Sequence, residues 1–169
     1  MRRTFIWFFL SCLLVLGISS CKEDLLGVDT GMPASLTVTI PQGIQQRSAS
    51  DYGTGASVNR CILEIYRNGV LYGERLVQPV NGGEVVFSGL RLVASQSYDF
   101  VLWADCADGL DDKYYNTTDL TAVTVKDAYT GNDDGYDAFF AHVTYEVDGA
   151  FSQNITLTRP FGQFNVKTN

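Results

Sequence analysis

The sequence reads FFAHVTYEVDGAFSQNITLT over residues 139–158, and its alternation of apolar and polar residues indicates the fold class. Apolar side chains occupy alternate positions in its first half: Phe139, Ala141, Val143, Tyr145 and Val147. In its second half, Phe151, Ile155 and Leu157 alternate with polar residues. A period of two is typical of a strand that buries one face, and the Asp148-Gly149 pair between the halves is a turn signal. We therefore expect two neighbouring strands joined by a tight turn.

The rest of the chain repeats this pattern in shorter pieces. We expect strands near residues 36–40, 61–65, 70–76, 85–87, 98–105, 139–147 and 151–158, with a short one at 123–125. The Asn68-Gly69 pair predicts a hairpin. Residues 98–105 are apolar on both faces, which indicates a central strand covered on each side. The sequence therefore predicts an all-β fold, a β-sandwich of about seven strands.

The first 20 residues have the parts of a signal peptide: Arg2 and Arg3, an apolar run over residues 5–17, and small residues before Cys21. The run Ile18-Ser19-Ser20-Cys21 fits the pattern at which bacterial lipoproteins are cleaved and acylated. The apolar run is well short of the roughly 20 residues of a membrane-spanning helix. We therefore expect a lipid on Cys21 to hold the chain on a membrane. A plain signal peptide, with Cys21 as an ordinary thiol, is the alternative.

Three charged residues follow the predicted acylation site directly: Lys22, Glu23 and Asp24. They resemble the export signal of Bacteroidetes surface lipoproteins, in which acidic residues come just after the acylated cysteine. The resemblance implies an outer-membrane lipoprotein at the cell surface, whereas a merely solvating tether is compatible with periplasmic retention. We divide the chain into a signal peptide (1–20), a lipidated tether (21–33) and a β-sandwich domain (34–169).

Composition and motifs argue against several classes of function. Without Arg2 and Arg3 the chain holds ten basic residues against 19 acidic ones, a net charge of −9, which disfavours nucleic acid as a partner. The only histidine, His142, has no accompanying nucleophile motif, so we expect neither an enzyme nor a cofactor. The aspartates of residues 108–112 and 133–137 lack calcium-loop spacing, and Asp is common in turns, so we expect no metal.

Two cysteines remain in the predicted domain, Cys61 and Cys106. Export brings them into an oxidising compartment, where a disulfide between them persists. Two separate buried thiols are the other interpretation, since cysteine is among the most buried residue types. The sequence leaves both open.

Aromatic residues offer a second functional interpretation. The candidates for a sugar-binding platform are Tyr98, Trp103, Tyr114, Tyr115 and Tyr136. Most aromatic side chains of a β-sandwich instead pack in its core. If these aromatic residues form a platform instead, the alternative function is that of a glycan-binding accessory lipoprotein.

Several blocks of sequence occur together in order: a lipoprotein signal, then residues 97–105, 114–120, 137–139 and 157–161. This succession resembles the N-terminal domain of Bacteroidales fimbrillin-like lipoproteins, which are fimbrial subunits and their anchors. The resemblance spans residues 34–169 and implies a transthyretin-like/Ig-like β-sandwich. It also implies a protein that acts by β-strand pairing in fimbria assembly or adhesion, with other fimbrial subunits as partners.

The resemblance gives roles to the first strand and the loop after it. In stalk subunits of that family a protease cuts at an arginine after the first strand, and a neighbour's strand fills the groove. Here the first strand is predicted at residues 36–40 and the candidate cut at Arg47, whereas an anchor keeps its lipid and its strand. Family members usually continue into a second sandwich domain, but this sequence ends at Asn169. An anchor, a stalk subunit, a short variant, an incomplete reading frame and a solitary surface lipoprotein all remain open.

Overall fold

Regular structure in the computed structural model is almost entirely β-strand, within the residues that it describes (31–43, 54–129, 131 and 133–161). The strands are β1 (Met32–Thr39), β2 (Arg60–Arg67), β3 (Val70–Leu71), β4 (Leu76–Pro79), β5 (Glu84–Leu92), β6 (Gln96–Asp105), β7 (Tyr115–Asn116), β8 (Thr124–Val125), β9 (Ala138–Val147) and β10 (Phe151–Thr156). The helical element of this region is a short 3-10 turn, η1 (Asp134–Tyr136). Accordingly, no helix here has the length and apolarity needed to cross a bilayer. The predicted all-β fold is confirmed.

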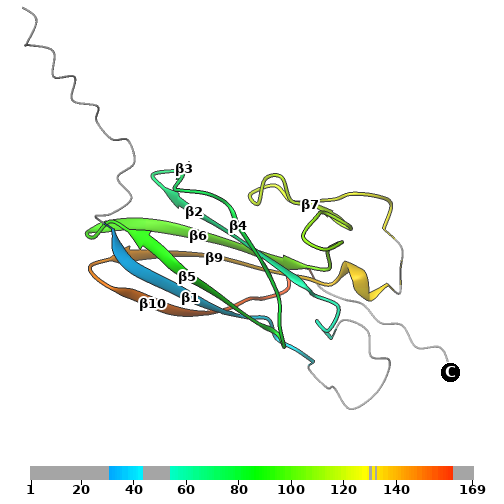
Figure 1. Cartoon of the computed structure of the whole chain (residues 1–169). Coiled ribbons are helices and arrows are strands. Elements are labelled where there is room, and N and C mark those ends of the chain that lie inside the picture. The colour runs from blue at the N-terminus through cyan, green and yellow to red at the C-terminus, as the bar shows by residue number, and fades with distance from the viewer. Residues whose placement is uncertain (1–30, 44–53, 130, 132, 162–169) are drawn as a thin grey trace, which may run out of the picture.

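Two sheets pack face to face as a sandwich (Figure 1). The three-stranded sheet has the order β10-β1-β5, and the five-stranded sheet has the order β3-β2-β6-β9, with β4 also beside β2. β1 is parallel to β10 and antiparallel to β5. β1 and β6 begin at the same end of the sandwich, which we call the proximal end, and β6 finishes at the opposite, distal end (Figure 1).

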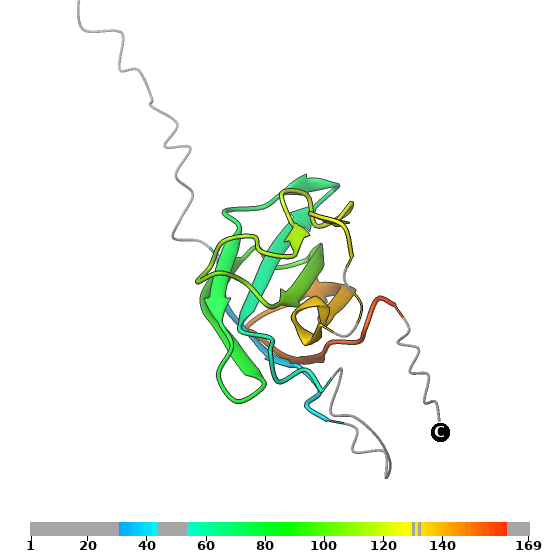
Figure 2. The same cartoon turned by 90° about the vertical axis from the view of Figure 1, so that its right-hand side faces the viewer.

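The main core lies between the two sheets, which Figure 2 shows as two layers. β1 contributes Leu36 and Val38, and β6 contributes Phe100 and Leu102, all fully buried. Burying a side chain of this size contributes roughly 1.5–3 kcal/mol. The inward faces predicted for residues 36–40, 61–65 and 139–147 are confirmed, because their alternate apolar residues belong to this core or pack against it.

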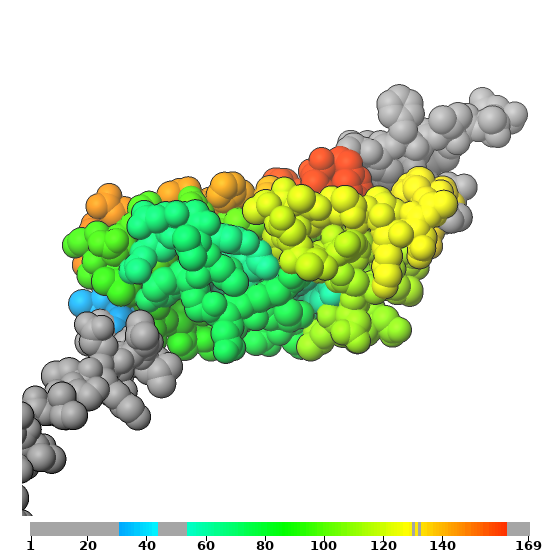
Figure 3. All heavy atoms as spheres, turned by 90° about the horizontal axis from the view of Figure 1, so that it is seen from above, coloured from blue at the N-terminus to red at the C-terminus, as the bar shows by residue number. Residues whose placement is uncertain are grey.

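A second apolar cluster lies on the outer face of the five-stranded sheet. Residues 106–137, which we call the cap, fold over this face at the distal end (Figure 3). Ile62, Val101 and Trp103 of the sheet pack beneath Tyr115 and Leu120 of the cap. β6 is therefore covered on both faces and lies between β2 and β9, as its apolar sequence predicts.

Two expectations about strand connections need correction. The Asp148-Gly149 turn does not join paired strands: β9 pairs with β6, whereas β10 pairs with β1 in the opposite sheet. Alternation shows which face is buried but not which neighbour a strand chooses, and both strands face the same core. The return strand expected at residues 70–76 is two strands, β3 and β4, with the chain leaving the sheet between them. Asn68 and Gly69 do form the predicted turn, with φ of 52° and 75°.

Candidate functional site

β1 is the strand to which the sequence resemblance gives a function, and it lies in the middle of its sheet. Leu36 and Val38 are 0% exposed, and Ala34 and Ile40 are also buried. The backbone register pairs Ala34–Thr39 with β10 on one side, and Met32–Thr39 with β5 on the other. Removal of β1 would therefore open an apolar groove between two unpaired strand edges. Such a groove is the acceptor that strand addition requires.

Backbone hydrogen bonds fix the distal end of this strand. Ile40 N–H donates to Gly83 O over 2.8 Å, and Leu157 N–H donates to Thr39 O over 2.9 Å. Gly43 N–H donates to Thr54 O over 2.7 Å, which closes the base of the segment that follows. The candidate cleavage residue Arg47 belongs to that segment and lies outside the described residues.

A buried ion pair joins β2 to β6 at the distal end. Arg60 Nε and Nη2 donate to the two carboxylate oxygens of Asp105 over 2.9 and 2.7 Å. Trp103 Nε1 also donates to Asp105, over 3.0 Å. Burial lowers the pKa of the Arg60 guanidinium, but hydrogen bonds and charges of Asp105 and Asp112 outweigh burial and raise it. Arg60 thus remains cationic, and its partner Asp105 orients the Trp103 indole beneath the cap.

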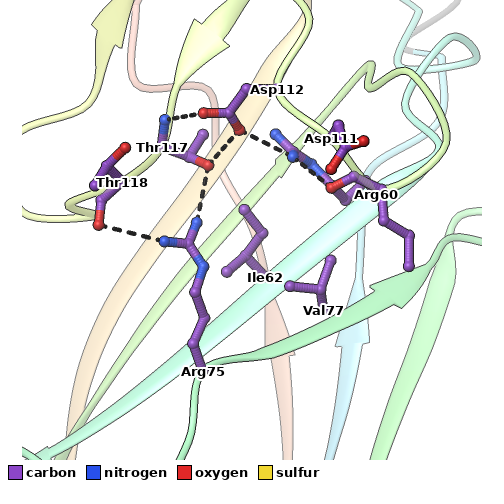
Figure 4. Close-up of a pocket in the computed structure, with 9 residues that line it drawn as sticks. Arg60, Ile62, Arg75, Val77, Asp111, Asp112, Thr117 and Thr118 are labelled. Carbon is purple, nitrogen blue, oxygen red and sulfur yellow. Dashed lines mark hydrogen bonds and ion pairs between the residues drawn. The ribbon is translucent and has the colours of Figure 1, made fainter.

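Asp112 of the cap extends this network into a pocket of about 450 Å³ (Figure 4). Its carboxylate accepts from Arg60 Nη1 over 3.0 Å, and from the hydroxyl and backbone N–H of Thr117 over 2.6 and 2.8 Å. Arg75 donates to Thr117 Oγ1 over 2.8 Å and lies 3.4 Å from Glu64. In the described region, every buried side-chain polar atom has a partner. The buried polar groups of the pocket are therefore already paired within a structural network.

A second ion pair joins three segments beside the β1 groove. Arg159 donates through Nε and Nη2 to the carboxylate of Asp137 over 2.8 and 2.9 Å, and its guanidinium lies 4.7 Å from the centre of the Phe139 ring. Asp137 also accepts from Gly55 N–H over 2.7 Å. Two of the blocks behind the family resemblance, residues 137–139 and 157–161, therefore meet in space. They hold residue 55, just after the segment that contains Arg47.

Three tyrosine rings form a row in the cap. The Tyr136 ring lies 4.8 Å from that of Tyr129 and 4.6 Å from that of Tyr114. Gly135 permits the Tyr114 contact, because a Cβ at this position would lie 2.4 Å from that ring. Tyr129 is 68% exposed and was not among the residues predicted from the sequence. Of the five predicted platform residues, Tyr98, Trp103, Tyr115 and Tyr136 are buried, so Tyr114 alone among them offers a surface.

The two cysteines of the domain lie in a strand and at a strand end, as expected, and the structure distinguishes between the two interpretations of them. Cys61 and Cys106 are both free thiols, so the candidate disulfide is not formed in the structure. Cys61 faces Ala104 across the β2–β6 ladder and points into the main core, whereas Cys106 follows the end of β6. Burial raises the pKa of Cys61 to about 12, and it also raises the pKa of Cys106. The lipidation and export residues Cys21, Lys22, Glu23 and Asp24 lie outside the described residues.

His142 is exposed on β9, where its Nε2 lies 3.7 Å from Asp99 Oδ1. The aspartates of the cap serve mainly as hydrogen-bond acceptors in loops, as Asp112 and Asp133 illustrate. Over the described ranges, no group of His, Cys, Asp and Glu has an arrangement that would hold a metal ion.

The sequence profile of the family of unknown function DUF6562 matches residues 27–169. The chain belongs to this family. The DUF6562 match covers β1, both sheets and the cap, so all the geometry described above belongs to the family region. Comparison with curated proteins and with solved structures finds no match.

Proposed function

We propose that this chain is a surface-displayed outer-membrane lipoprotein, a fimbrial subunit or anchor that acts by β-strand pairing and has no catalytic activity. The observation that carries the proposal is the position of β1, a central strand that lies between β10 and β5. The sequence before it supports a lipid on Cys21 and an export signal at Lys22, Glu23 and Asp24. The membrane is then one partner and other fimbrial subunits are the second.

The β1 groove defines what an incoming strand must supply. The strand must run parallel to β10 and antiparallel to β5, as β1 does. It must carry apolar side chains at the positions of Ala34, Leu36 and Val38, because these face the core. Each large aliphatic residue contributes roughly 1.5–3 kcal/mol on burial, so exchange is slow unless the resident strand is first released.

Processing at Arg47 would supply that release in a stalk subunit. A cut there leaves β1 attached only through its ladders and the contacts of its side chains. The Asp137–Arg159 pair and its bond to Gly55 keep the other side of the cut in place. An anchor subunit would remain uncut, with β1 and its lipid retained.

The test is the mass and lipid state of the protein recovered from the outer membrane of its host. A lipidated, monomeric species that begins at Cys21 indicates an anchor or a solitary surface lipoprotein. A delipidated species that begins at Ser48 and migrates in high-molecular-weight ladders indicates a stalk subunit. Cys21→Ala should lose the lipid, and Arg47→Gln should prevent the cut only. A protein without lipid that begins at neither residue contradicts the proposal.

One observation favours the alternative, a glycan-binding accessory lipoprotein. Tyr129 and Tyr114 present ring surface at the distal end, away from the proposed anchor. Trp103 is a poor reporter of such binding, since it is only 5% exposed. Calorimetry with host and bacterial glycans should give heat that is lost in Tyr129→Ala and kept in Val70→Ala, a control at the proximal end. Equal heats in both variants would exclude this row of tyrosines.

A further inference from the structure

Among the edge strands that the structure describes, β9 is the longest. β9 spans Ala138–Val147 without Gly or Pro, and β6 is its partner in the sheet. Two of the other edges are protected, and the third belongs to β10, which is only 6 residues long. β5 has a bulge next to Gly89, whose φ is 74°, and the opposite edge of the five-stranded sheet is split between β3 and β4 and ends at Pro79. Bulges, short strands and proline are the usual devices that prevent edge pairing.

One bridge shows to which side the backbone N–H and C=O groups of each β9 residue point. Phe140 N–H donates to Thr158 O over 2.8 Å, and Thr158 N–H donates back over 3.0 Å, on the side away from β6. Successive residues of a strand direct their backbone groups to opposite sides. His142, Thr144 and Glu146 therefore direct theirs to the open side, and no other described segment bonds to them.

We propose that two copies of this chain pair antiparallel through their β9 edges, with Thr144 of each copy opposite Thr144 of the other. The two sandwiches then share one continuous sheet across a two-fold axis. Each copy supplies the same three residues with open backbone groups, so the contact is closed and self-complementary. The proposal does not depend on the lipid or on strand exchange.

The side chains favour this register over its neighbours. On the outer face, His142 lies opposite Glu146 of the second copy, and the two threonines lie side by side. Thr–Thr pairs stabilise adjacent strands, and a protonated His142 would form an opposite-charge pair with Glu146. A contact centred on His142 would instead set two histidines opposite one another, and a contact centred on Glu146 would set two glutamates opposite one another. Asp99 holds the outer face in place, because it accepts a 2.5 Å hydrogen bond from Thr144 Oγ1 and lies beside His142.

The inner face of β9 is also incompletely buried at this edge. Val143 and Tyr145 are only half-buried, although both pack against the main core. In the proposed register Val143 meets Tyr145 of the second copy, an aromatic and β-branched pair of the kind that stabilises sheets. The contact is small for a protein interface, so we expect a weak, concentration-dependent dimer. Confinement to a membrane surface would raise its population.

The first test uses sedimentation equilibrium of the purified full chain up to about millimolar concentration, the range that weak contacts require. Wild-type protein should reach a dimer, and Thr144→Pro should remain monomeric. Proline suits this test because the Thr144 N–H is not used by β6, so no ladder bond is lost. Glu146→Lys should weaken the dimer at least tenfold. A wild-type monomer at all concentrations, or a Thr144→Pro dimer, overturns the proposal.

Cysteine cross-linking tests the register, and it decides the matter if Thr144→Pro fails to fold. In a background in which Cys12, Cys21 and Cys106 are changed to Ser, Thr144→Cys should form a disulfide-linked dimer under mild oxidation, because opposed Cα atoms lie about 5.5 Å apart in such a pair. His142→Cys is the matched control and should not cross-link, since it faces Glu146. Equal cross-linking by both variants, or none by Thr144→Cys, contradicts the register.

Discussion

β1 and β9 have similar alternating sequences but opposite positions in the sandwich. β1 is bonded on both sides, by β10 and β5, and its inward residues Leu36 and Val38 are completely buried. Among the described residues, β9 is paired with β6 on one side and is bonded on the other side only at Phe140, and its inward residues Val143 and Tyr145 are half-buried. The same local pattern therefore gives one strand whose loss opens the core and one strand whose outer edge is available for a partner.

The largest difference between β1 and β9 is expected when the same charge is placed in both strands. Val38→Asp should destabilise the domain by at least about 4 kcal/mol, because a charge there has no route to water. Val143→Asp should cost only about 1–2 kcal/mol, since its carboxylate can reach solvent at the open edge. Urea unfolding followed by circular dichroism measures both. Equal losses would mean that β9 is as enclosed as β1.

Proline substitution distinguishes the two strands by their backbone hydrogen bonds. Thr37 and Thr144 both lie on outer faces, but Thr37 belongs to a strand paired on both sides. Thr37→Pro should cost about 3 kcal/mol through a lost ladder bond and an unpaired acceptor, whereas Thr144→Pro should cost less than about 1 kcal/mol. The measurement is again urea unfolding of monomeric protein. A Thr144→Pro loss as large as that of Thr37→Pro would show that the β9 edge is already occupied within one chain.

Hydrogen exchange tests the comparison without mutation. At low protein concentration, the amide of Thr37 should exchange more slowly than that of Thr144 by roughly two orders of magnitude or more. The reason is that only the Thr144 amide faces an open edge. Protection at Thr144 should rise with protein concentration if the β9 dimer forms. Strong, concentration-independent protection at Thr144 is the contrary outcome.

The smallest expected effect on the stability of the protein comes from the cap, which serves as a control region. Burial raises the pKa of Asp112, but hydrogen bonds from Thr117 and Arg60 outweigh it and hold the pKa below its ordinary value of 3.8. A lowered pKa in the folded state stabilises the protein above the unfolded value, and this contribution disappears as pH falls below about 3.8. Asp112→Asn should therefore flatten the acid limb of the stability curve, measured by thermal unfolding between pH 2 and 6 (roughly the window of carboxylate titration). The ranking of β1 and β9 variants should not change.

The strand faces were predictable because burial of one face imposes a period of two, and Leu36, Val38 and Tyr145 all face the main core as expected. The partner of each strand was not predictable in this way. Residues 148–149 form a sequence signal for a hairpin, yet the chain crosses there from one sheet to the other. A turn motif constrains only a few backbone angles, whereas strand choice depends on contacts with distant β1.

The polar part of the fold was not predictable at all. Arg60 and Asp105 are 45 residues apart, and no local pattern announces their ion pair. The same register explains why a cysteine pair looked plausible: Cys61 and Cys106 are the next residues along from Arg60 and Asp105. They do not oppose each other, because Ala104 is the residue opposite Cys61. One position along a strand decides the face to which a side chain points.

The exchangeability of β1 is tested most directly with a specific protease site in place of residues 46–50. The cut protein is mixed with a labelled peptide of residues 31–43, and incorporation is followed by gel filtration in mild urea. The control peptide carries Val38→Asp. We predict slow, stoichiometric incorporation of the wild-type peptide into folded protein and none of the control. Loss of β1 with irreversible unfolding, or equal behaviour of both peptides, would contradict the account.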